Sequence, residues 1–234
     1  MDPYLVLYQD DDILVVDKLA PLPVQKDKSG DPDLQGLVKK EQLELSIFLE
    51  AAHRIDRRTS GIVLFAKNRF ALSVLDEAFR DRTIRKTYIA CLEREPSPPE
   101  GTLVHAIVKD PRRNLTVARA VDAPKTPGLA TQIAKLDYRL ALRTDNYFFV
   151  EASPHTGRHH QIRAQFSAMG WPIKGDLKYG ARRSSASGRI MLHGWRIEFR
   201  HPRSGKPMDI KAPFPPDERL WQVYADSLAP QPEA

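Results

Sequence analysis

Apolar residues along this chain fall mainly in short runs that are bounded by polar and turn-forming residues. Runs of this length, rich in β-branched and aromatic side chains, predict strands. The strands expected are Tyr4–Tyr8, Ile13–Asp17, Ile62–Ala66, Thr83–Leu92, Ile133–Leu142, Tyr147–Ala152, Met191–Phe199 and Met208–Lys211. The turns Asp10–Asp12 and Thr144–Asn146 should each join two neighbouring strands of this set.

Helical signals are confined to a few segments. Asp31 followed by Pro32 is a typical helix start, Asn68 can cap a second helix, and Gly170 can close a third. The helices expected are 31–43, Phe70–Arg80, Arg158–Met169 and one in the tail after Pro215. The pattern therefore predicts many strands and few helices, which is typical of an α+β fold.

Two segments lack regular apolar spacing and are expected to be loops. Glu95–Gly101 is rich in proline, and Asp110–Gly128 is long and basic. Basic residues of the second loop are candidates for phosphate contacts, and a solvated loop is the alternative. These residues are Arg112, Arg113, Arg119 and Lys125.

A polar, arginine-rich loop precedes the apolar run Ile62–Ala66. Asp56 lies in this loop with Arg54, Arg57 and Arg58 close by in the sequence. Positive charge nearby favours an ionised carboxylate, so Asp56 is suited to act as a nucleophile or base. Chemistry alone leaves two alternatives open: a turn residue in a solvated loop, or a basic phosphorylation motif.

Composition narrows the classes of protein. The chain has 234 residues, 41% of them apolar, with a net charge of +6 and a pI near 9.4. This size allows one domain, in one or two lobes, and the positive charge suits an anionic partner. A single cysteine, Cys91, leaves no disulfide framework within the chain. We expect a cytoplasmic protein without a signal peptide or membrane span, because no run of 18 apolar residues occurs.

The loop around Asp56 carries a specific signature. His53-Arg54-Ile55-Asp56-x-x-Thr59-Ser60-Gly61 resembles the H-R-[LI]-D-x-x-T-S-G motif of the RNA pseudouridine synthases of the RluA type. The opening segment Leu7–Lys18 also resembles that family. It departs at Lys18-Leu19-Ala20-Pro21, where the family has K-P-x-G, and this departure concerns a local turn and one wall of the cleft.

The resemblance continues to about residue 215. Lys86, Tyr88 and Ala90 match K-x-Y-x-A on one face of a strand. The segment 156–165 resembles T-G-R-T-H-Q-[LI]-R-V-H, with His159 in place of threonine and Ala164-Gln165 in place of Val-His. Further segments resemble G-H-P-I-x-G-D-x-x-Y-G and L-H-A…H-P…G-[KE]…A-P, at 170–180 and 192–213.

The resemblance implies a fold and a reaction. The fold would be a mixed, mostly antiparallel sheet with flanking helices and a long basic cleft. The reaction would be isomerisation of uridine to pseudouridine in structured RNA, without a cofactor or metal. Asp56 would be the catalytic residue, Tyr88 would help to remove the C5 proton, and Arg163 would pair with Asp56. A half-buried core position is the alternative for Tyr88.

The same resemblance implies residues that bind RNA. The target base must be flipped out of the stack, and Arg54 is placed to fill the gap that it leaves. Phosphates would be held by Arg57, Arg58, Arg158 and Lys174. Thr59 and Ile162 complete the expected substrate-binding set, and Ile162 should also face the core with Phe166, four residues later.

We expect the catalytic domain to span residues 1–215, followed by a C-terminal helix and tail over 216–234. No separate N-terminal RNA-binding domain is expected. The partner would be ribosomal or transfer RNA, and the protein would be a monomer.

Two other classes of protein remain open. One is an RNA-binding or chaperone module that kept the fold without the activity. The other is a metal-dependent hydrolase built on His155, His159 and His160. The latter lacks an H-E-x-x-H motif and a cysteine pair, and Pro154 and Gly157 disfavour a helix that would align two of the histidines.

Overall fold

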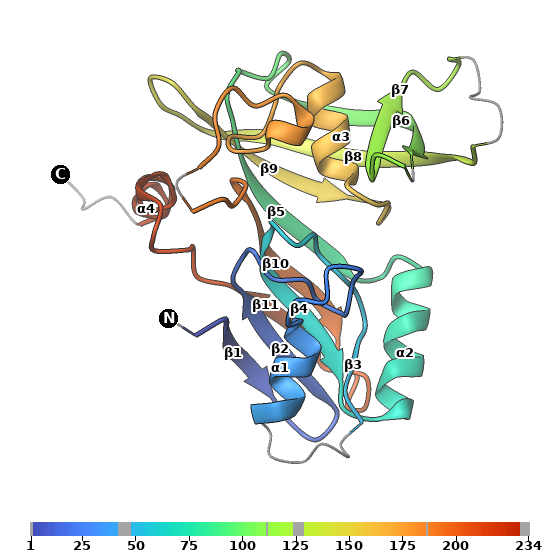
Figure 1. Ribbon diagram of the computed structural model, residues 1–234. Coiled ribbons are helices and arrows are strands. Elements are labelled where there is room, and N and C mark those ends of the chain that lie inside the picture. Colours follow the sequence, from blue (N-terminus) through green and yellow to red (C-terminus); the bar gives the residue numbers. More distant parts are fainter. Residues whose placement is uncertain (1, 42–47, 111, 124–128, 186, 230–234) are drawn as a thin grey trace. The chain divides into compact units, whose positions relative to one another are not determined.

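The computed structural model describes residues 2–41, 48–110, 112–123, 129–185 and 187–229. The chain forms two compact units, and each is built from two separate stretches of sequence (Figure 1). Unit 1 contains Met1–Lys86 and His193–Pro213, and unit 2 contains Thr87–Leu192 and Phe214–Ala234. No helix among the described residues is long and apolar enough to cross a membrane.

The sheet of unit 1 has the strand order β1-β2-β4-β10, with β3 beside β4 and β11 beside β10. Its strands are β1 (Tyr4–Gln9), β2 (Ile13–Lys18), β3 (Glu50–Ala51), β4 (Ser60–Ala66), β10 (Leu192–Arg200) and β11 (Pro207–Lys211). Neighbours are antiparallel except β4 and β10, which run parallel where Ser60 lies opposite His193 and Gly61 opposite Gly194. The helices of unit 1 are α1 (Leu34–Glu41) and α2 (Arg69–Arg80).

Every residue of β2 and β4 is buried, which explains why these strands show no alternation of apolar and polar residues. Helix α2 packs on one face of this sheet and contributes to a shared core. Its members include Ile13 and Val15 of β2, Ile62 and Leu64 of β4, Ala71 and Leu75 of α2, and Ile197 and Phe199 of β10. The N-terminus of α2 is fixed by Asn68, whose side chain accepts a hydrogen bond from the Ala71 N–H.

The sheet of unit 2 is fully antiparallel in the order β5-β9-β8-β6-β7. Its strands are β5 (Arg85–Leu92), β6 (Glu100–Asp110), β7 (Leu115–Arg119), β8 (Thr131–Arg143) and β9 (Phe148–Pro154). Its helices are α3 (Gln161–Ala168), the short 3₁₀ helix η1 (Leu177–Tyr179) and α4 (Arg219–Ser227). Helix α4 packs through Trp221 and Tyr224 against Phe149 of β9.

The structure confirms the fold class: a mixed, mostly antiparallel sheet with flanking helices. It also confirms the expected strands, the cap at Asn68 and the helix in the tail, each within a few residues. The predicted loops are partly wrong. Residues Leu115–Arg119 form β7, and β6 begins at Glu100 inside the proline-rich segment. Strand β7 escapes detection because it is only five residues long and lies between arginines.

Two predicted helix starts need correction. Helix α1 begins at Leu34, because Asp33 supplies the capping oxygen to the Gly36 N–H at 3.0 Å, in place of Asp31. Helix α3 begins at Gln161 and not at Arg158, because His160 has a left-handed backbone (φ 51°) that cannot continue a right-handed helix. The expected end of the first helix near Leu43 and the basic side chain of Lys125 lie outside the described residues.

Candidate active site

Unit 1 holds the loop of Asp56 by its main chain. The Asp56 carbonyl accepts a hydrogen bond from the Thr59 N–H at 3.0 Å, which closes a turn immediately before β4. The carbonyl of the next residue, Arg57, accepts from the Leu22 N–H at 3.0 Å and from Lys18 Nζ at 3.4 Å. Lys18 lies at the end of β2 and is fully buried. The loop is therefore anchored to the segment that follows β2.

His53 anchors the entry of this loop. Its Nε2 accepts a hydrogen bond from the Leu64 N–H at 3.2 Å, and its ring lies 5.2 Å from the ring of Phe79 on α2. Burial, assisted by the nearby charge of Lys86, lowers the pKa of His53 to about 3. Burial also lowers the pKa of Lys86 to about 8. His53 is therefore a neutral structural group at neutral pH.

The exit of the loop is tightly packed. The hydroxyl of Ser60 lies 2.9 Å from Nδ1 of His193, a fully buried residue at the start of the parallel pairing. Burial lowers the pKa of His193 to about 3, so this contact joins two uncharged groups. Gly61 adopts φ 120°, and a Cβ there would lie 2.3 Å from the backbone nitrogen of Gly194. Only glycine fits this approach of two strands.

The predicted binding residues of this loop differ in their surroundings. Arg54 and Arg58 are exposed, whereas Thr59 is buried. Arg57 is engaged by the preceding segment: its guanidinium pairs with Asp31 and lies 3.1 Å from the hydroxyl of Ser29. The expected phosphate contacts of these side chains stay predictions.

In unit 2, Arg163 of α3 occupies a buried ion pair. Its Nε lies 2.6 Å from Oδ2 of Asp176, and its Nη2 lies 2.9 Å from Oδ1. The side chains are only 6% and 2% exposed, so the pair is sheltered from water. The guanidinium also lies 4.7 Å from the ring centre of Tyr179. The expected pairing of Arg163 with Asp56 stays a prediction, and Asp176 is a partner that sequence reasoning missed.

The hydroxyl of Tyr179 is held by two further groups. It accepts a hydrogen bond from the Thr116 N–H at 2.9 Å and lies 2.8 Å from Nδ1 of His160. The Thr116 hydroxyl lies 2.8 Å from Nδ1 of His159, whose ring stacks on that of His160 at 3.7 Å. The signal for Asp176 and Tyr179 was present in the sequence, because both belong to the segment that resembles G-D-x-x-Y-G.

The remaining predicted site residues of unit 2 lie on α3, on β5 and in nearby turns. Tyr88 is 8% exposed on β5, where it pairs with Ala152 of β9. Ile162 is buried, as expected. Arg158 is exposed in the turn before α3, and half-buried Lys174 places Nζ 5.8 Å from the ring of Tyr147.

The histidines proposed for a metal site have other contacts. His155 is exposed and its Nε2 lies 2.5 Å from Oδ2 of Asp137. His159 and His160 use Nδ1 toward Thr116 and Tyr179. Among the described residues, the geometry of a metal site is approached instead by another group, Asp10, Asp12 and His201, whose ligand atoms lie within 4.8 Å of one another.

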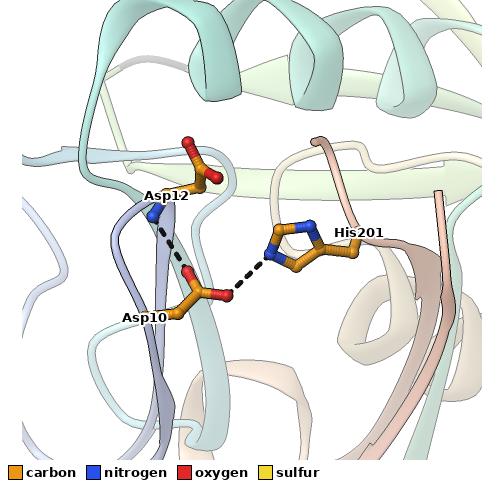
Figure 2. A group of neighbouring side chains, drawn as sticks. All are labelled: Asp10, Asp12 and His201. Carbon is orange, nitrogen blue, oxygen red and sulfur yellow. Dashed lines mark hydrogen bonds and ion pairs between the residues drawn. The ribbon is translucent and has the colours of Figure 1, made fainter. Parts of the chain in front are cut away.

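The carboxylates of that group are occupied by the protein itself, and Figure 2 shows two of the contacts of Asp10. Asp10 accepts from two backbone N–H groups at 2.9 Å and lies 2.7 Å from Nε2 of His201. Asp12 forms a two-point contact with Arg203 at 2.6 Å and accepts from Asn68 at 2.8 Å. These contacts connect the β1–β2 turn, the cap of α2 and the β10–β11 turn, so the group has a structural role.

Comparisons with known proteins agree on a family. The sequence profile of a family described as RNA pseudouridylate synthase matches residues 12–168. Ribosomal large subunit pseudouridine synthase C of Vibrio vulnificus (strain CMCP6) is 33% identical over 94% of this chain and 68% of its own length. The uncharacterized RNA pseudouridine synthase YjbO of Bacillus subtilis (strain 168) is 32% identical over 92% of this chain and 74% of its own length.

A solved structure shares the fold. Human RNA Pseudouridylate Synthase Domain Containing 4 superimposes with a TM-score of 0.75 at 22% identity, over 95% of this chain and 92% of that one. At this identity the match supports the fold and nothing finer.

Proposed function

Because the chain belongs to the RNA pseudouridine synthase family of the RluA type, we propose that it isomerises specific uridines in ribosomal or transfer RNA with Asp56 as the catalytic residue. The family membership makes the protein an RNA pseudouridine synthase, which is an isomerase. The names of relatives such as synthase C make large-subunit ribosomal RNA the first substrate to test.

The reaction rearranges the bonds of one nucleoside. The bond from N1 to C1′ breaks, the base turns, and C5 bonds to C1′. The C5 proton then leaves and N1 takes up a proton. Asp56 would act at the sugar as nucleophile or acid–base group, and Tyr88 would help to remove the C5 proton. The family chemistry conserves all atoms of the uridine and involves no redox step, so no cofactor is proposed.

Arg163 would set the carboxylate of Asp56. A guanidinium carries several N–H donors in a planar arrangement, so it can pair with more than one carboxylate. The ion pair with Asp176 supports this role, because it fixes the plane of the guanidinium in a buried place.

RNA binding would use basic side chains, of which Arg58 and Arg158 are exposed and Arg57 and Lys174 are half-buried. Arg158 would hold phosphate oxygens, with Arg57, Arg58 and Lys174, while Thr59 and Ile162 would contact the nucleotide. A uridine in structured RNA must be flipped out to reach Asp56, and exposed Arg54 would fill the gap in the stack. The long basic cleft, the catalytic domain over 1–215, the monomeric state and the cytoplasmic location belong to the same proposal.

The observation that carries the proposal is the position of Asp56. It lies at a turn that is fixed on both sides by main-chain hydrogen bonds, inside a nine-residue signature of the family. A carboxylate held in this way is preorganised for attack on a bound substrate.

Pseudouridine mapping tests this function. Ribosomal and transfer RNA from cells with and without the protein would be compared, and the lacking cells complemented with wild type, Asp56→Asn or Asp76→Asn. Asp76 is exposed on α2 and serves as the matched control. Wild type and Asp76→Asn should restore the same sites, and Asp56→Asn should restore none, with purified protein losing at least about a hundredfold in rate. Residual turnover of Asp56→Asn within about tenfold of wild type would contradict the assignment.

A further inference from the structure

We propose that Tyr179 is a positioning residue for Arg163, and that Thr116, His159 and His160 hold it in place. This role deepens the proposed function and rests on it, because Arg163 matters to the reaction only if it sets Asp56.

Arg163 is held from two directions by one short segment. Asp176 binds the edge of the guanidinium, and the ring of Tyr179 covers its face at 4.7 Å. These two residues are three apart at the 3₁₀ helix η1, where side chains at i and i+3 lie on the same side. The Tyr179 N–H donates to the Asp176 carbonyl at 2.9 Å, which fixes that spacing.

The turn before η1 is itself immobilised. Gly175 has φ 85°, and a Cβ there would lie 2.7 Å from the carbonyl oxygen of Arg189. Asp176 therefore follows a backbone position that can hardly shift. Tyr179 is buried, and its hydroxyl makes further contacts that hold the ring.

The hydroxyl of Tyr179 contacts two separate segments. It accepts a hydrogen bond from the Thr116 N–H at 2.9 Å and lies 2.8 Å from Nδ1 of His160. The hydroxyl thus ties the ring under Arg163 to strand β7 and to the residue before α3.

His159 closes this arrangement, and it is also where the sequence departs from the resembled motif. Its ring stacks on His160 at 3.7 Å, and its Nδ1 lies 2.8 Å from the hydroxyl of Thr116. Thr116 consequently touches both ends: its N–H meets Tyr179 and its side chain meets His159. The turn of the β6–β7 hairpin carries exposed Arg112 and Arg113. Through Thr116, this hairpin contacts the residues that hold Arg163.

The decisive variant is Tyr179→Phe, because it keeps the ring and removes only the hydroxyl. We expect the single-turnover rate on a ribosomal RNA substrate to fall about five- to twentyfold, with RNA affinity within twofold of wild type. Thr116→Val keeps the N–H that donates to Tyr179 and removes the hydroxyl that contacts His159 and Tyr179, so it should cost less, about two- to fivefold.

Tyr224→Phe is the matched control. Tyr224 is a buried tyrosine of α4 in the same unit, and its hydroxyl has no hydrogen-bond partner among the described residues. Loss of the Tyr224 hydroxyl should leave the single-turnover rate unchanged. A purely structural role of Tyr179 would lower the amplitude of the single-turnover phase, since fewer molecules would be folded, and would leave the rate constant as it is. That outcome, or a Tyr179→Phe rate within twofold of wild type, would overturn the inference.

A second measurement separates this inference from the proposed function. Solvent exchange of the Arg163 Nε–H can be followed by NMR, with the signal assigned through its loss in Arg163→Lys. Exchange should be slow in wild type and in Tyr224→Phe, and about tenfold or more faster in Tyr179→Phe. Equal exchange in all three would overturn the positioning role even in an active enzyme. If wild type made no pseudouridine, the proposed function would fail, while the exchange rates would still decide the role of Tyr179.

Discussion

The loop that carries Asp56 and the residues that surround Arg163 show two ways to hold a side chain that the proposed reaction needs. Unit 1 fixes the Asp56 loop through main-chain hydrogen bonds, close backbone packing and neutral histidines at its entry and exit. Unit 2 fixes Arg163 through a buried opposite charge and an aromatic face. The first arrangement should be disturbed most by substitutions that add bulk to the backbone packing. The second should be disturbed most by substitutions that remove a charge.

The difference has a physical reason. The hydrogen bonds that fix the Asp56 loop are made to its main-chain carbonyls and not to the carboxylate that the proposed reaction needs. A buried guanidinium, in contrast, cannot be left without a counter-charge, because desolvation of an unpaired ion costs several kcal/mol. Asp176 therefore stabilises the folded protein as well as orienting Arg163.

Shape sensitivity is tested most severely at Gly61. In Gly61→Ala the new Cβ would lie 2.3 Å from the nitrogen and 2.4 Å from the oxygen of Gly194, at φ 120°. We expect a loss of at least about 4 kcal/mol in the free energy of unfolding, measured by urea denaturation. Gly205→Ala is the control: its φ is also positive (67°), but no atom lies within 4 Å, so it should cost only about 1 kcal/mol. Equal losses would show that φ alone matters and that the strand contact does not.

Charge sensitivity is tested at Asp176. Asp176→Asn removes the counter-charge of a buried guanidinium and should lower the free energy of unfolding by about 3–5 kcal/mol. Turnover should fall even for protein that remains folded, and Arg163→Met should lose turnover as well. The control is Asp209→Asn. Asp209 is exposed and pairs with Arg196 through two hydrogen bonds of 2.7 Å, so the loss of its charge should lower the free energy of unfolding by under about 1 kcal/mol. If both substitutions lowered the free energy of unfolding by a similar amount, burial of the Arg163–Asp176 pair would not matter to stability.

Asp17 of unit 1 is a buried carboxylate on β2, the strand that ends with Lys18. Burial raises its pKa to about 7, against the opposing effects of Lys18 and of a hydrogen bond from the Gly61 N–H. The folded state therefore holds this proton more tightly than the unfolded state, and stability falls as pH rises from about 4 to 7. Asp17→Asn should remove this loss.

The expected gain of Asp17→Asn over wild type is on the order of 2–4 kcal/mol at pH 8 relative to pH 4.5. Urea denaturation of both proteins across this range measures it. A stability difference that stays constant with pH would show that Asp17 is ionised in the folded state at all of these pH values.

The smallest expected effects concern RNA binding. Log affinity should fall linearly with log salt, with a slope of roughly −3 to −6 for about four to seven neutralised phosphates. Arg158→Glu should weaken binding to all RNAs alike and flatten the slope by about one unit. Arg54→Ala should instead lower turnover more than affinity, since its cost falls on the flipped state. Filter binding across a salt series and single-turnover kinetics separate the two, and a slope near zero would contradict a basic binding surface.

The sequence was most informative where a function is carried by neighbouring residues. The buried run of β4 and the cap at Asn68 depend on local chemistry, and each lies where it was expected. The signature around Asp56 is also local, and the catalytic role that it indicates stays a prediction. The partner of Arg163 could not be derived in this way. Asp176 lies 13 residues from Arg163, and Thr116 lies 63 residues from Tyr179, which it contacts. Such contacts depend on how strands and turns pack.

The left-handed backbone of His160 had no local signal either. Histidine tolerates φ > 0 only at some cost, and here the stacking on His159 and the bond to Tyr179 accompany it. Strand β7 was missed for a related reason: its five residues gain stability only by pairing with β6.

The division of the chain bears on how the protein is made. Strand β4 pairs with β10, but β10 and β11 follow the whole of Thr87–Leu192 in the sequence. A nascent chain on the ribosome must therefore keep the edge of β4 uncovered until more than a hundred further residues have been added. Long-range closure of this kind slows folding and leaves apolar strands open to aggregation. Neither unit can be expressed as one contiguous fragment, and a ribosome that stalls before His193 releases a chain with an incomplete sheet.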